Sequence, residues 1–99
     1  KGFVDFTTDS VMKQVVAYYN QHGSANERML AYYLLGCAYR DLDDSPASLD
    51  CYLQATEQAD TLSRDCDYHT LASIYGQIGE EDQRQRMILR KLLKLELAW

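Results

Sequence analysis

Two reactive side chains, Cys66 and His69, are three residues apart in the sequence and would lie on one face of a helix. A thiol and an imidazole at that spacing are compatible with a metal site, or with a thiolate nucleophile and its base. Cys37 could approach them across a groove. A metal site needs three or four ligands, however, and a thiolate nucleophile needs a third group that orients the base. Because the sequence offers neither set, we expect no metal, no cofactor and no catalysis.

An acidic run at residues 41–45 resembles the start of a calcium-binding loop. Such a loop requires a glycine at its sixth position and a bidentate glutamate at its twelfth. Pro46 and Tyr52 occupy those positions here. We therefore interpret the run as the end of one helix followed by the N-cap of the next.

The last segment of the chain begins with acidic residues and continues with basic ones, an order that complements the helix dipole. Its basic residues are Arg84, Arg86, Arg90, Lys91 and Lys94. A basic amphipathic helix is also the kind that contacts an anionic membrane or a nucleic acid. The net charge of −5 for the whole chain disfavours nucleic-acid binding. We expect no nucleic-acid partner and no membrane contact, and no segment has the length and apolarity of a membrane span.

The composition is that of one soluble helical domain: 99 residues, 46% hydrophobic and 25% charged, with five glycines and one proline. Apolar residues recur at helical spacing in about five segments, which predicts an all-α chain. The predicted helices cover approximately residues 9–21, 25–41, 45–59, 64–78 and 80–99. Short connections between them favour antiparallel neighbours. The three cysteines cannot all pair within one chain, which favours a reducing compartment such as the cytoplasm.

Turn signals separate these helices. Gly23 is expected to end the first helix in the left-handed conformation, and residues 24–27 fit a capping box for the second. Ser45 is the expected N-cap of the third helix, with Pro46 in its first turn. Gly79 is expected to end the fourth helix. The chain starts without methionine and stops within a helical pattern, so we interpret it as a fragment of a larger protein.

The segment 32–55 contains residues at the spacing of a known helical repeat. Tyr32, Leu35, Gly36 and Tyr39 are followed by Ser48, Tyr52 and Ala55. This pattern resembles the tetratricopeptide repeat, and its overall character is similar to the repeats of bacterial multi-repeat proteins. Small residues at such positions let two helices approach while aromatic residues fill the surrounding space.

A second, weaker unit follows about 36 residues later, close to the period of the family. Tyr68, Leu71, Ala72 and Tyr75 match its first helix, whereas the second helix departs from the pattern at Arg84, Ile88 and Lys91. The resemblance implies a solenoid fragment of antiparallel helix hairpins in a single domain. Its units would be the second helix of a truncated repeat at 9–23, a repeat at 26–60 and a degenerate repeat at 64–99.

In this family, ligands contact the inner wall formed by the first helix of each unit. Carried over by position, the resemblance implies a binding surface of nine residues. They are Leu30, Tyr33, Cys37, Arg40, Asp41, Cys66, His69, Ser73 and Gln77. Tyr33 and Cys37 stand where one subclass carries a Lys and an Asn that grip a peptide carboxylate, so that activity is not expected. Each of these residues could alternatively line a solvated groove or pack against a neighbouring repeat.

Two functions from different classes remain open at this level. The first is a non-catalytic scaffold that binds a protein or peptide, and the second is a structural or sensory segment of a bacterial regulatory protein that self-associates. An enzyme using Cys66 and His69 is the least favoured. Homodimers could form through the exposed ends of the solenoid, because an open end leaves an apolar face uncovered.

Overall fold

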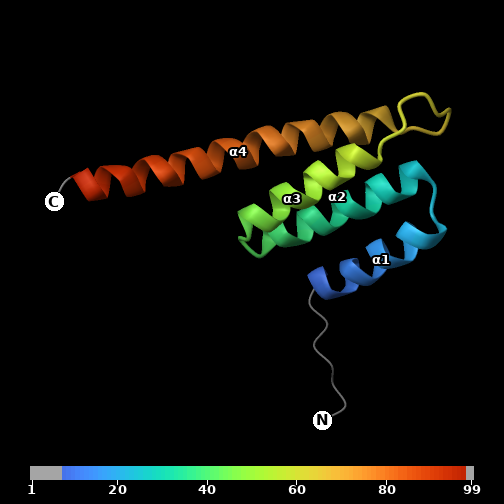
Figure 1. The fold of residues 1–99 in the computed structure, drawn as a ribbon, viewed down its shortest axis with the longest axis horizontal. Coiled ribbons are helices and arrows are strands. Elements are labelled where there is room, and N and C mark those ends of the chain that lie inside the picture. Colours follow the sequence, from blue (N-terminus) through green and yellow to red (C-terminus); the bar gives the residue numbers. More distant parts are fainter. Residues whose placement is uncertain (1–7, 98–99) are drawn as a thin grey trace, which may run out of the picture.

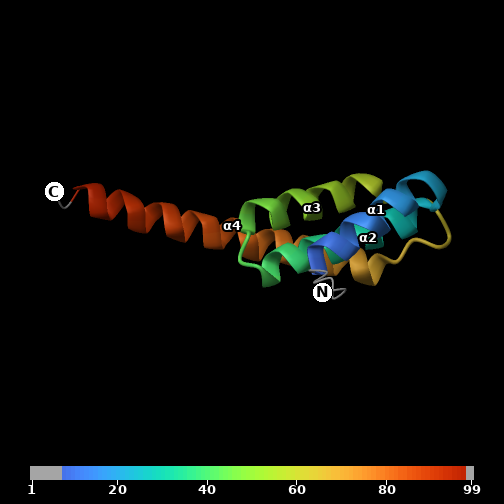
Figure 2. The same ribbon diagram turned by 90° about the horizontal axis from the view of Figure 1, so that it is seen from below.

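The computed structural model describes residues 8–97 as four α-helices: α1 (Thr8–His22), α2 (Ala25–Asp41), α3 (Ser45–Gln58) and α4 (Tyr68–Leu97). The prediction of an all-α chain is confirmed for these residues, which contain no strand. Helices α1, α2 and α3 lie side by side, and α4 starts beside the α2–α3 hairpin and extends well beyond its end (Figures 1 and 2). None of these helices is long and apolar enough to cross a membrane.

The ends of α1 and α2 follow the sequence closely, with one correction. The predicted capping box is present, because Glu27 donates its backbone N–H to the Ser24 hydroxyl and accepts from the Ser24 N–H at 2.9 Å. Helix α1 ends before Gly23, as expected, but Gly23 has no positive φ. A Cβ at this position would lie 2.8 Å from the Tyr19 backbone oxygen, so close approach favours glycine here.

The turn between α2 and α3 also differs in detail from the prediction. Asp44, rather than Ser45, caps α3 and accepts the backbone N–H of Ala47 at 3.2 Å. Asp43 takes the left-handed conformation with φ of 60°, which aspartate tolerates better than most residues. Pro46 lies in the first turn of α3, as predicted. The Ser45 hydroxyl is therefore left to interact with α4.

Small residues bring α2 and α3 together. The buried hydroxyl of Ser48 donates a hydrogen bond to the Gly36 carbonyl at 2.9 Å. A Cβ at Gly36 would lie 2.6 Å from the ring of Tyr52, which is fully buried. The sequence prediction that Gly36 and Ser48 allow this close approach is confirmed.

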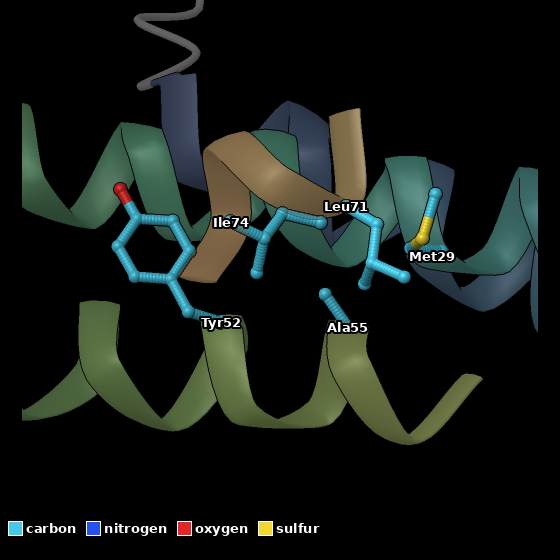
Figure 3. Packing of buried hydrophobic residues seen from close by; sticks show 5 residues of the cluster. All are labelled: Met29, Tyr52, Ala55, Leu71 and Ile74. Carbon is cyan, nitrogen blue, oxygen red and sulfur yellow. The ribbon is translucent and has the colours of Figure 1, made fainter. Parts of the chain in front are cut away.

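The main hydrophobic core lies where α3 meets α2 and α4. Tyr52 and Ala55 of α3 face Leu71 and Ile74 of α4, and Met29 of α2 completes the cluster (Figure 3). A second cluster joins α1 to the α2–α3 hairpin and consists of Val16, Ala31, Leu35 and Cys51. Burial of these side chains holds the four helices together, because burial of apolar surface is the main favourable term in folding.

Helix α4 departs most from the prediction. The expected break at Gly79 does not occur, since one helix runs continuously from Tyr68 to Leu97, and the start expected at Arg64 lies four residues later. The five-helix count is not confirmed, because the last two predicted helices are one. Gly79 has no positive φ, and glycine inside a helix costs only about 1 kcal/mol. Strong helix formers after Gly79 offset that cost. Residues 98–99 of the predicted 64–99 unit lie outside the described part.

Candidate protein-binding wall

The nine residues of the predicted binding surface are called the wall below, and its aromatic part packs directly on the core. Tyr33 and Cys37 of α2 are half-buried and pack against the core cluster of Figure 3. The ring of Tyr33 lies 5.9 Å from that of Tyr52, and the Tyr52 hydroxyl donates to the Cys37 sulfur at 3.7 Å. Burial, and then the neighbouring Cys37, raise the pKa of Tyr33. These contacts limit the freedom of both wall side chains.

The charged part of the wall joins α2 to α4. Arg40 donates from Nη1 to Oε1 of Gln77 at 3.1 Å, and its Nη2 lies 3.5 Å from the Asp41 carboxylate. This is a contact between two residues of the predicted surface that are 37 positions apart in the sequence. The guanidinium is about one-third exposed, so it remains open to a further partner.

The other predicted residues differ in accessibility. Leu30 and Asp41 of α2 are exposed, as are His69 and Ser73 of α4. Cys66 is buried and precedes α4, so its backbone N–H contacts Ser63 in the connecting loop rather than a helical neighbour. The structure thus places Tyr33 and Cys37 against Tyr52 and joins Arg40 to Gln77. It leaves four of the predicted residues exposed on the same two helices and buries Cys66.

The expected pairing of Cys66 and His69 on one helical face is wrong, because α4 begins only at Tyr68. One side chain is buried and the other is exposed. Within residues 8–97, no three His, Cys, Asp or Glu side chains are grouped so that they could hold a metal ion.

Sequence reasoning missed a buried polar cluster at the crossing of α3 and α4. Glu81 is fully buried, and its Oε2 accepts the Ser45 hydroxyl at 2.6 Å, while Arg84 lies 3.7 Å from Oε1. Neither Glu81 Oε1 nor Gln85 Nε2 has a hydrogen-bond partner among the described residues. Glu81 follows Leu71, Ile74 and Ile78 at helical spacing. Extending that stripe through Gly79 would have placed Glu81 in the interface.

The chain matches no protein-family model, no curated protein and no solved structure. A function for the chain must therefore be inferred from the geometry of the wall and from the resemblance of its sequence to the tetratricopeptide repeat.

Proposed function

We propose that the chain is a non-catalytic protein- or peptide-binding module of the tetratricopeptide type, and that it binds its partner on the wall formed by α2 and the start of α4. The observation that carries the proposal is that Tyr33 and Cys37 of α2 both contact Tyr52, while Arg40 of the same helix donates to Gln77 of α4. Tyrosine and arginine are the residue types that most often dominate binding at protein interfaces.

The rigidity of this surface supports the proposal. Tyr33 packs against a fully buried tyrosine, and Arg40 is held by a neighbour from another helix. A surface fixed before binding loses less conformational entropy when the partner arrives. The mixture of an aromatic ring, a cation and exposed polar groups favours an extended peptide that carries both apolar and acidic side chains.

Peptide selection tests this function. A displayed random-peptide library would be selected on the intact chain, and the affinity of the recovered peptides measured by calorimetry. We expect Tyr33→Ala and Arg40→Ala each to weaken binding about tenfold or more, equivalent to about 1.4 kcal/mol. Tyr18→Ala on α1 and Arg64→Ala in the α3–α4 loop are the matched controls, because both residues are exposed and neither belongs to the nine-residue predicted surface.

The controls should bind within about twofold of the unaltered chain. Failure to recover any peptide, or equal binding by the wall variants and their controls, would refute the proposal. Circular dichroism would establish that each variant keeps its helical content.

A further inference from the structure

Two glycines, Gly76 and Gly79, lie about one turn apart inside α4, and nothing in the straight helix requires them. Neither has a positive φ. Among the described residues, no atom beyond the local helix backbone lies within 4 Å of a Cβ added at either position. Glycine weakens a helix interior, because it loses more backbone freedom on folding than other residues do. The pair therefore makes this part of α4 the easiest part to bend.

Exposed apolar side chains line α4 on both sides of these glycines. Before them, Tyr68, Ala72 and Tyr75 form a proximal stripe at spacings of four and three, and the two tyrosines are 58% and 59% exposed. After them, Ile88 and Leu92 form a distal stripe and are 51% and 54% exposed. This stripe lies on the part of α4 that extends beyond the α2–α3 hairpin (Figures 1 and 2). Such stripes normally pack against another element, and the straight helix leaves both in water.

The sequence after Gly79 has the features of a helix that begins there. Glu80, Glu81 and Asp82 follow the glycine directly, and the basic Lys94 lies in the last turn of α4. Carboxylates stabilise a helix from its first turn, near the positive end of the dipole, and this effect is absent in the middle of a continuous helix. Glycine is also the residue that most often ends a helix. The order of these residues therefore favours a turn between two helices at Gly79.

The straight helix also leaves buried polar atoms unpaired. Glu81 is fully buried, and its Oε2 accepts the Ser45 hydroxyl at 2.6 Å, but its Oε1 accepts no hydrogen bond from the described residues. Gln85 Nε2, about one turn later, has no hydrogen-bond partner among them either. A buried polar atom without a partner destabilises the state that contains it. A turn at Gly79 would move both side chains away from α3 and would break the contact with Ser45.

We propose that α4 is a hinged helix with two states, the straight one described above and a folded-back one. In the folded-back state α4 turns at Gly79, and its distal half packs antiparallel on its first half, so that the distal stripe covers the proximal stripe. The hydrogen bond between Ser45 and Glu81 stabilises the straight state. The partner of the proximal stripe is the distal half of the same chain, because the covalent link gives that half an effective concentration of about millimolar or more. A second copy at micromolar concentration competes poorly with it.

Disulfide trapping tests the folded-back state on the intact 99-residue chain, with its three native cysteines replaced by alanine. Ala72→Cys and Ile88→Cys place one thiol on each stripe, each eight residues from Glu80. Along the straight helix their Cα atoms lie about 24 Å apart, whereas a disulfide needs less than about 7 Å. Under mild oxidation we expect a disulfide within one chain, measured as the loss of both free thiols at the mass of the monomer.

The matched control is the pair Ser73→Cys and Met87→Cys, in which both positions are exposed and each lies seven residues from Glu80. Helical spacing places both positions off the two stripes, so their thiols should stay reduced. Circular dichroism would establish that every variant keeps its helical content.

Two further variants test the hinge itself. Gly76→Ala combined with Gly79→Ala should slow formation of the disulfide about tenfold, because alanine favours the straight helix at both positions. Ser45→Ala should speed it about threefold, because the straight state loses the hydrogen bond to Glu81.

Thiols on the two stripes that stay reduced, or a rate that the two alanines do not change, would overturn the proposal. A disulfide between chains, seen as a covalent dimer, would assign the stripes to a second copy and would also overturn it. The experiment involves no peptide, so its failure leaves the proposed binding function untouched.

Discussion

The same substitution, glycine to alanine, should have opposite effects at two positions of this chain. At Gly36 the new Cβ would lie 2.6 Å and 2.7 Å from two ring carbons of Tyr52 and 3.3 Å from the Cβ of Cys51. Tyr52 is fully buried, so its ring cannot move without disturbing the core. Overpacking of this kind costs about 1–3 kcal/mol, and the better helix propensity of alanine returns about 1 kcal/mol. We expect a net loss of up to about 2 kcal/mol.

At Gly79 no atom lies within 4 Å of the new Cβ. Alanine should therefore stabilise α4 by about 0.5–1 kcal/mol, because only the propensity change remains. Both free energies of unfolding would be measured by urea denaturation followed by circular dichroism. A third variant, Gly36→Ala with Tyr52→Leu, separates the causes, since a smaller neighbour should make the added methyl group less costly. If Gly36→Ala is as stable as the original chain, the described contact between α2 and α3 is wrong.

Three further predictions concern titration and the shape of α4. Burial, with Asp50 and Asp44 nearby, raises the pKa of the Cys51 thiol from 9.0 to about 11. The folded state therefore favours the neutral thiol, so the contribution of Cys51 to the free energy of unfolding should be fully present below pH 9.0 and be lost as the pH rises toward about 11. Denaturation measured across this pH range should show a smaller loss of stability for Cys51→Ala than for the unaltered chain. Hydrogen bonds from the hydroxyl and the backbone N–H of Thr70 lower the pKa of Asp67 below 3.8. The ionised carboxylate therefore stabilises the folded state, and denaturation should show that Asp67→Ala loses more stability at neutral pH than at a pH below 3.8. The shape of α4 can be measured with spin labels at the exposed positions 69 and 90, in a chain whose native cysteines are replaced by alanine. Along a continuous α4 the two labels should lie about 30 Å apart, whereas a distance of about 10 Å would indicate a hairpin at Gly79.

Local signals in the sequence located most of the first three helices. The capping box at Ser24 and the proline in the first turn of α3 depend on neighbouring residues alone, and both predictions are confirmed. The approach of α2 to α3 was also predictable, because only small residues such as Gly36 and Ser48 permit it. These features require no knowledge of distant contacts.

The errors arose where a residue had two compatible conformations or where distant packing decided the result. Glycine ends helices and is also tolerated inside them, so Gly79 alone could not distinguish a turn from a continuous helix. Ser45 and Asp44 are both good N-caps, and the contact of Ser45 with Glu81, 36 residues away, is not visible in local sequence. Cys66 appeared accessible only because α4 was expected to start earlier.

The candidate wall remains a prediction that the repeat resemblance implied. Of the nine residues carried over by position, Tyr33 and Cys37 contact Tyr52, and Arg40 contacts Gln77. The supporting role of Tyr52 beneath the wall was not predicted, because the sequence pattern assigned it only to helix packing. The ring of Tyr52 lies against Gly36, where α2 and α3 approach closely, and also beside the ring of the wall residue Tyr33.

The binding wall is tested most directly by mapping where a selected peptide protects the chain from amide hydrogen exchange. Addition of a saturating peptide to the intact chain should slow exchange in residues 30–41 of α2 and 69–77 of α4, and leave α1 unchanged. Protection confined to residues 82–97, or to the outer surface of α3, would contradict the assignment of the α2–α4 wall as the binding surface.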